Sequence, residues 1–230
     1  MTEKSPKNVS VSYMIMGVVF CVCLIAANLL ETKVVKMGPL AVTGGLLVFP
    51  VSYILNDCIV DVWGFRKMRL VIWLGFAMNF FVVLLGGLAC ALPSPSYWEG
   101  AEAFRFIFAL APRITAASLL AFLVGSFLNA LVMSKMKLHD GSRRFSLRAV
   151  LSTLAGEGAD SLIFFPLAFG GLMPVEDLLG LMLVQVVLKT LYELIILPVT
   201  IRVVRWVKRR EGVDVRDNGI SYNVFKIKEL

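Results

Sequence analysis

Three charged residues lie deep inside apolar runs of the chain. Glu157 and Asp160 occur in STLAGEGADSLIFFP, and Lys189 occurs in LMLVQVVLKTLYELIILP. Carboxylates accept hydrogen bonds from ring N–H groups and amines, and an ammonium group nearby balances their charge. These residue types therefore predict a site for a polar solute or a pathway across an apolar medium. The alternative is a buried ion pair that only fixes the register of two helices.

Helical spacing places these charges on defined faces. Thr153, Glu157 and Asp160 are separated by four and three residues, so they share one face of a helix. Lys189 and Glu193 belong to a second stripe with steps of four. A third stripe has the same spacing and consists of Tyr53, Asp57 and Asp61, with Asn56 beside it. The candidate substrate-binding residues are Glu157, Asp160, Lys189, Asn56, Asp57, Arg113 and Glu193.

Some of these candidates have a simpler interpretation. Asp57 and Asp61 lie toward the end of their block, where Arg66 and Lys67 follow as potential ion-pair partners at a membrane surface. Arg113 stands at the start of the helix expected in another block, where its long side chain could reach lipid headgroups. For these residues the sequence leaves a structural role and a binding role open.

The composition indicates the medium around these charges. The 230 residues are 58% hydrophobic, with a mean hydropathy of +0.82, whereas ordinary globular domains are about 45–50% apolar. The excess falls in blocks long enough to cross a bilayer, at 11–30, 39–62, 70–92, 104–134, 146–169 and 178–205. We therefore expect an all-α membrane protein with six transmembrane helices in one bundle.

Two of these blocks carry further expectations. In the fourth block, Pro112 is expected to begin the helix proper, with 104–110 at the surface or re-entering. The third block has only Asn79 as a strongly polar residue, which predicts a lipid-facing or supporting helix.

The distribution of basic residues predicts the orientation. With the N-terminus in the cytoplasm, one of the 23 Lys and Arg residues, Lys189, lies within a span, and most of the rest fall on the cytoplasmic side. The exceptions are Lys33, Lys36, Arg105 and Arg113. This asymmetry favours both termini in the cytoplasm. The chain then divides into a cytoplasmic N-terminus (1–10), a six-helix transmembrane domain (11–207) and a cytoplasmic basic tail (208–230).

The net charge of +7 is explained by this topology. The segment RVVRWVKRR is expected to anchor the end of the last span on anionic lipid, and nucleic acid is not expected as a partner. His139 is the only histidine, and the four cysteines form no CxxC pair. The sequence therefore predicts no metal site and no other cofactor. A phosphate-binding GxxxxGK[ST] motif is also absent from the chain.

Three classes of membrane protein compete for this pattern. An ion channel favours a ring of one charge or a carbonyl filter, and the mixed charges here offer neither. GEGAD resembles the GxGD motif of intramembrane aspartyl proteases, but its acid comes one residue too late and Asp57 follows Asn56 rather than tyrosine. A carrier of a small polar solute fits best, because carboxylates, amides and aromatic rings together suit a flat heterocycle.

Four stretches of the chain resemble the queuosine precursor transporter family. They are TGGLLVFPVSYILNDCIVDVWGFRKMRLVIWLGF, GSFLNALVMSKMK, RAVLSTLAGEGADSLIFFPLAFGG and KTLYELIILPVTIRVVRWVKRREGVDVRD, and the resemblance covers about residues 26–225. This is a bacterial inner-membrane family, similar in architecture to vitamin-uptake transporters. The resemblance implies a six-helix transporter, not an enzyme. It also implies import of 7-deazaguanine bases, such as 7-cyano-7-deazaguanine or queuine, for salvage into tRNA modification.

The resemblance leaves the energy source open. The chain works alone, or it is the substrate-binding component of an energy-coupled vitamin-type uptake complex with an unknown coupling protein. The sequence shows no clear docking motif of small residues for such a partner, which favours a chain that works alone.

Overall fold

Long helices dominate the described part of the chain. The computed structural model describes residues 10–226 except 31, 38–39, 109–111, 141–143 and 173. The elements follow in the order α1 (Val11–Leu30), β1 (Val34–Met37), β2 (Leu40–Thr43), the 3₁₀ helix η1 (Gly44–Leu47), α2 (Phe49–Trp63), α3 (Phe65–Ala91), α4 (Ala101–Phe108), α5 (Pro112–Asp140), α6 (Phe145–Phe169) and α7 (Val175–Glu211). The expected all-α class is confirmed, with a small antiparallel β1–β2 hairpin in addition.

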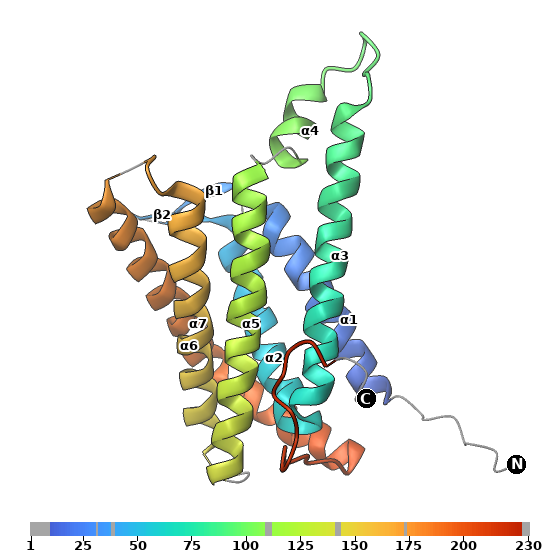
Figure 1. Cartoon of the computed structure of the whole chain (residues 1–230), viewed down its shortest axis with the longest axis vertical. Helices are drawn as coiled ribbons and strands as arrows, with labels where there is room; N and C mark the ends of the chain where they lie inside the picture. The colour runs from blue at the N-terminus through green and yellow to red at the C-terminus, as the bar shows by residue number, and fades with distance from the viewer. Residues whose placement is uncertain are drawn as a thin grey trace, which may run out of the picture.

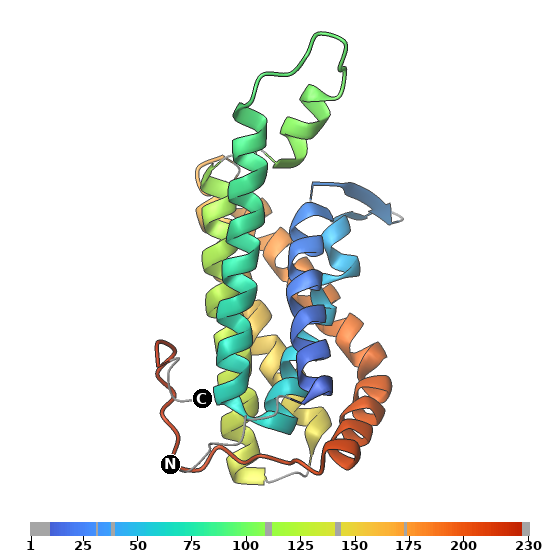
Figure 2. The same ribbon diagram turned by 90° about the vertical axis from the view of Figure 1, so that its right-hand side faces the viewer.

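The long helices form a bundle with two distinct ends (Figure 1). The hairpin and α4 lie at one end, here called the hairpin end, and the start of α1 and the end of α7 lie toward the other (Figures 1 and 2). Lys137, Arg148 and Lys208 gather at this second end, here called the basic end. Of the predicted N-terminal segment, 1–10, only Ser10 is described. The cytoplasmic location of the termini stays a prediction.

Five helical segments of the described chain are long and apolar enough to cross a membrane. They are Val11–Leu30, Gly44–Trp63, Phe65–Ala91, Ala116–His139 and Leu178–Glu211. The 25 residues of α6 are long enough, but Arg148, Glu157, Asp160 and several hydroxyl residues on its buried face lower its hydropathy. A membrane span at α6, which would bring the number to six, therefore stays a prediction. The polar residues of α6 that lower its hydropathy are buried against the other helices.

The start of the second predicted span, 39–62, was wrong. Residues 40–43 form strand β2, and α2 begins only at Phe49, with Pro50 in its first turn, where a missing N–H costs nothing. Between them, η1 passes close to the end of α1, because the Gly44 N–H donates to the Lys33 carbonyl at 2.7 Å. A Cβ at Gly44 would lie 2.7 Å from the Leu30 carbonyl oxygen, so this approach requires glycine.

The fourth predicted span divides as the proline indicated. Pro112 begins α5, and α4 is a separate short helix without a buried residue, standing off the hairpin end (Figure 1). Residues 104–108 belong to this helix, their place at the membrane surface or re-entering stays a prediction, and residues 109–110 lie outside the described part of the chain.

An apolar core joins α1, α2, α3 and α5. Phe20 and Leu24 of α1 pack with Ile59 of α2 and with Met68 and Ile72 of α3. All five side chains are almost completely buried. This core holds α2 against α5 and leaves its other face for the polar residues described next.

Candidate functional site

The polar stripes of α2 and α6 face each other turn by turn. Asp61 pairs with Arg148, and Asp57 accepts from Ser152. Tyr53 contacts Gly156, where a Cβ would lie 2.6 Å from its ring. Each step of four residues rises about 6 Å along a helix, so these pairs mark successive levels of one buried polar column. The column runs from the middle of the bundle to the basic end.

The central cluster consists of Glu157, Asp160 and Lys189, with Phe49 and Tyr53 beside them. The Lys189 Nζ lies 2.8 Å from the Glu157 Oε2 and 3.7 Å from the Asp160 Oδ2. It also lies 3.9 Å from the centre of the Phe49 ring, a cation–π distance. The structure therefore brings together the three charges with which the sequence argument began. Two carboxyl groups share one ammonium group, so the cluster has one acid more than it has cations.

Several polar atoms of the central cluster have no hydrogen-bond partner among the described residues. The Glu157 Oε1 and the Tyr53 hydroxyl are both fully buried and unpartnered. A buried polar group without a partner costs free energy, so such atoms point to a ligand or to bound water. Phe49 and Tyr53 also present adjacent aromatic rings, with centroids 5.6 Å apart.

Glycines let the helices approach closely around Tyr53. A Cβ at Gly156 would lie 2.6 Å from the Tyr53 ring and 2.9 Å from the Asn129 Cβ. A Cβ at Gly125 would lie 2.6 Å from the Tyr53 hydroxyl. Gly158 differs, since a Cβ there would meet nothing within 4 Å. The GEG sequence thus contains one glycine that is needed for packing and one that is not.

A second group of polar residues lies one turn nearer the basic end. Ser152 donates to both oxygens of Asp57, at 3.0 and 3.1 Å. Glu193 lies beside Asp57 and Thr153. Asn129 donates to the Thr153 hydroxyl at 3.4 Å. Among the described residues no Lys or Arg lies within ion-pair distance of Asp57, and the groups around this carboxyl are a hydroxyl, an amide and a second carboxyl.

Asn56 lies apart from this group. Its amide nitrogen donates to the Ser126 carbonyl at 3.0 Å, and its Oδ1 has no partner among the described residues. Arg113 belongs to α5, but its side chain lies outside the described residues. The structure thus places six of the seven candidate residues in or beside the column.

Asp61 is the centre of an ion-pair cluster at the basic end. The Arg148 Nη2 lies 2.6 Å from its Oδ1, and the Lys208 Nζ lies 2.6 Å from its Oδ2. Lys137 donates to the Asp61 carbonyl and to Asp214. These partners, and not Arg66 or Lys67, are the cations within ion-pair distance of Asp61 in the described chain. The expected pairing was wrong, because Asp61 faces the bundle interior while Arg66 and Lys67 follow the break at Gly64.

The segment after α7 folds back over the basic end. The Asp217 Oδ2 accepts from the Phe65 N–H at 2.8 Å and from the Ser134 hydroxyl at 2.5 Å. Gly64 adopts a φ of 85°, and a Cβ there would lie 2.6 Å from the Asp217 Oδ1. Arg69 donates to the Ser221 and Asn223 carbonyls, at 3.1 and 2.7 Å.

Tyr222 completes the contacts of this segment. Burial raises the pKa of its phenol, so the hydroxyl stays protonated and can donate to Ser134, 3.0 Å away. Lys208 was expected to lie on lipid with the rest of RVVRWVKRR, but it points inward to Asp61. The tail is therefore at least partly a cover for the basic end of the column.

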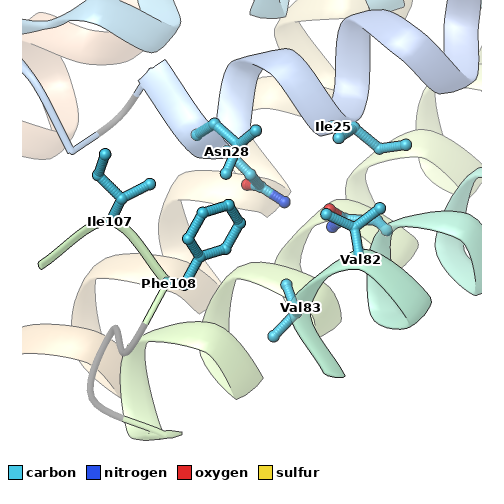
Figure 3. Close-up of a pocket in the computed structure, with 8 residues that line it drawn as sticks. Ile25, Asn28, Val82, Val83, Ile107 and Phe108 are labelled. Carbon is cyan, nitrogen blue, oxygen red and sulfur yellow. The ribbon is translucent and has the colours of Figure 1, made fainter. Parts of the chain in front are cut away.

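A small cavity lies away from the column, toward the hairpin end (Figure 3). Its volume is about 20 Å³, and its lining residues are Ile25, Asn28, Leu29, Asn79, Val82, Val83, Ile107 and Phe108. The Asn28 Oδ1 accepts from the Ser118 hydroxyl at 3.1 Å. Asn79, the single polar residue noted in the third block, is 1% exposed and faces this cavity instead of lipid.

Membrane-length helices around a buried, charged interior are typical of membrane transport proteins. Residues 43–203 match the family described as "Putative vitamin uptake transporter", and the chain belongs to this family. The match places the chain in a family of transporters and not of enzymes.

Curated relatives agree with the resemblance seen in the sequence. The chain is 28% identical over 177 residues to a "Probable queuosine precursor transporter" of Bacillus subtilis, covering 76% of each chain. It is 30% identical over 127 residues to the "Queuosine precursor transporter" of Escherichia coli, covering 55% of each chain. It is 27% identical to a "Probable queuosine precursor transporter" of Haemophilus influenzae, covering 55% of this chain and 52% of that protein. No solved structure matches the chain.

Proposed function

We propose that this protein imports queuosine precursors across the bacterial inner membrane for salvage into tRNA modification. The substrates are 7-deazaguanine bases, such as 7-cyano-7-deazaguanine or queuine. The names of the relatives support the substrate class. The observation that carries the proposal is the central cluster, in which two buried acids share one lysine beside two aromatic rings.

The chemistry of the substrate fits this cluster. A 7-deazaguanine presents a ring N–H and an adjacent exocyclic amine on one edge, and one carboxylate can accept from both. Glu157 has an oxygen that meets no hydrogen-bond partner in the described chain, while its other oxygen lies against Lys189. Asp160 lies farther from Lys189, at 3.7 Å, so it is the acid that is less tightly held by the cation. Asp160 and Glu157 therefore act as acceptors, and Lys189 orients them.

The aromatic residues supply the second part of recognition. Phe49 and Tyr53 lie one helical turn apart on α2 with their ring centroids 5.6 Å from each other, and stacking of a base on an aromatic ring contributes on the order of 1–3 kcal/mol. The unpartnered Tyr53 hydroxyl can donate to a ring nitrogen or a carbonyl oxygen of the base. In this proposal Asp57, Glu193 and Asn56 line the route from the central cluster toward the basic end, which faces the cytoplasm.

Uptake in cells tests the proposal. A strain that cannot synthesise queuosine precursors and lacks its own transporter is supplied with limiting 7-cyano-7-deazaguanine, and queuosine in its tRNA is measured. Expression of this chain should restore the modification, and an empty vector should not. As a control, a precursor concentration high enough to enter cells unaided should restore the modification without the protein. The proposal fails if this control works but well-expressed protein leaves the tRNA unmodified at limiting precursor.

Purified protein distinguishes a chain that works alone from the substrate-binding component of a complex. Vesicles containing only this chain should accumulate or exchange labelled base if it works alone. Binding without movement across the membrane would favour the energy-coupled complex instead.

A further inference from the structure

The cavity at the hairpin end contains a buried amide that the fold does not satisfy. The Asn79 side chain is 1% exposed, and its Nδ2 has no hydrogen-bond partner among the described residues. Asn28 lies across the same cavity, held by Ser118 (Figure 3). The remaining lining is apolar. Two amides in an apolar pocket offer hydrogen-bond donors and acceptors to a small polar ring, and an unsatisfied buried donor needs an occupant.

The cavity is linked to the central cluster through two helices. Asn28 follows Ala27, which packs against Phe49 and Tyr53. Ser118 lies two turns before Gly125 on nearly the same face of α5, and Gly125 lies against Tyr53 and Asp160. The two sites are therefore separated by about 10 Å along α5, on the basis of 1.5 Å per residue.

Phe108 closes the cavity on the side of the hairpin end. Its ring lines the cavity and packs over Gly86, where an added Cβ would overlap the ring. Phe108 belongs to α4, which has no buried residue. The other aromatic contacts of α4 are local, with the Phe104 and Phe108 rings 4.7 Å apart and Trp98 next to Phe104, so they do not tie the helix to the bundle. An element with so little burial opens at low cost in free energy.

We infer that the cavity is an outer binding station for the planar solute, with Asn28 and Asn79 as its polar contacts and Phe108 as its gate. This inference rests on the proposed function. The cavity of about 20 Å³ holds one water molecule with Phe108 in place. Outward movement of Phe108 with α4 enlarges it enough to admit a heterocycle, and return of the ring encloses the solute before it moves to the central cluster.

Thiol accessibility tests the gate without depending on uptake. Asn79→Cys is made in a background in which Cys21, Cys23, Cys58 and Cys90 are alanine, and a membrane-impermeant thiol reagent is added on the side of the hairpin end. We expect slow labelling of this variant. Adding Gly86→Ala should make labelling several-fold faster, because the new methyl group displaces Phe108. Gly87→Ala is the matched control, since a Cβ there meets nothing within 4 Å.

Uptake kinetics test the station itself. Asn79→Leu keeps the size of the side chain and removes both hydrogen-bonding groups, so it should raise the half-saturation concentration about tenfold while the maximal rate changes little. Asn79→Gln should restore much of the affinity. If the Asn79 amide binds only water, the half-saturation concentration of Asn79→Leu should equal that of the original protein, and that result would overturn the inference.

The accessibility experiment separates this inference from the proposed function. One outcome is that Gly86→Ala speeds labelling, but 7-cyano-7-deazaguanine does not protect the thiol introduced by Asn79→Cys and is not transported. In that case the gate stands and the substrate assignment fails. The other outcome is that the base is transported, but the introduced thiol is never labelled or is labelled equally fast with Gly86→Ala and with Gly87→Ala. In that case the outer station is wrong and the proposed function stands.

Discussion

The two charged clusters of the polar column use the same helices in opposite ways. At the basic end, both oxygens of Asp61 face cations, Arg148 on one side and Lys208 on the other. In the central cluster, two acids share Lys189, and a Glu157 oxygen has no hydrogen-bond partner among the described residues. Cations outnumber acids around Asp61, whereas acids outnumber cations around Lys189.

This difference distinguishes a cluster that stabilises the fold from a cluster that can bind a solute. A carboxylate enclosed by cations and covered by the tail has no capacity left for a solute, and removing it leaves buried charges alone. A cluster with an unpartnered oxygen, an excess acid and aromatic rings retains that capacity. We therefore propose that the Asp61 cluster holds the helices together and that the central cluster binds the solute.

The largest effect on stability is expected from Asp61→Asn. It removes the charge that balances Arg148, Lys137 and Lys208, and breaking a buried ion pair on one side costs about 3–5 kcal/mol. The yield of monodisperse protein and its melting temperature should both fall sharply. A variant that melts like the original protein would remove the distinction between the two clusters.

Asp160→Asn should affect uptake and not folding. It keeps the size of the side chain and replaces an acceptor by a donor, which costs about 2–4 kcal/mol of affinity, or roughly 30- to 1000-fold. Uptake at limiting substrate should be abolished, and Glu157→Gln should act similarly. Expression and melting temperature are measured in parallel. Normal transport by both variants would mean that these acids only fix helix register.

Two glycines of α6 sharpen the comparison within one turn. Gly156→Ala places a methyl group against the Tyr53 ring and the Asn129 Cβ, and overpacking of this kind costs about 1–3 kcal/mol. Gly158→Ala meets no atom within 4 Å and gains helix propensity, so it should be neutral or stabilising by up to about 1 kcal/mol. Thermal unfolding of the two variants measures the difference, and equal melting temperatures would argue against the close approach at Tyr53.

The smallest effect is expected from Asp214→Asn. Asp214 contacts Lys137 at 2.6 Å and Lys208 at 2.9 Å, but its side chain is 39% exposed, so water screens these pairs. We expect a loss of about 1 kcal/mol or less, seen as a slightly lower melting temperature, with uptake unchanged. A large loss of uptake would instead give the tail a part in transport.

The sequence predicted which residues share a face of a helix better than it predicted which residues on other helices they contact. Steps of four and three correctly placed Glu157 and Asp160 on one face of α6, because helical periodicity alone determines which residues share a face, and the fold brings Lys189 of α7 against that face. The partners of Asp61 depend on how far α2 and α6 are shifted along each other, and periodicity does not determine that shift. Arg148 was nevertheless detectable, since it continues the stripe of Ser152 and Gly156 one turn earlier.

The hairpin and the tail were harder to predict for different reasons. VVKM and LAVT flank Gly38 and Pro39, a strand–turn–strand signal that the apolar block at 39–62 obscured. Phe49 was missed because an aromatic residue in an apolar helix has no signal of its own, although it lies under Lys189. The tail contacts of Asp214 and Asp217 join residues far apart in sequence, so only the fold could reveal them.

Equilibrium binding to the purified protein tests the assignment of the two clusters most directly. Labelled 7-cyano-7-deazaguanine is titrated into the original protein, Asp160→Asn and Asp214→Asn, each shown to be folded by its melting temperature. The account predicts that Asp160→Asn weakens binding at least roughly 30-fold, while Asp214→Asn binds like the original protein. Unchanged binding by Asp160→Asn, or a comparable loss in Asp214→Asn, would contradict it.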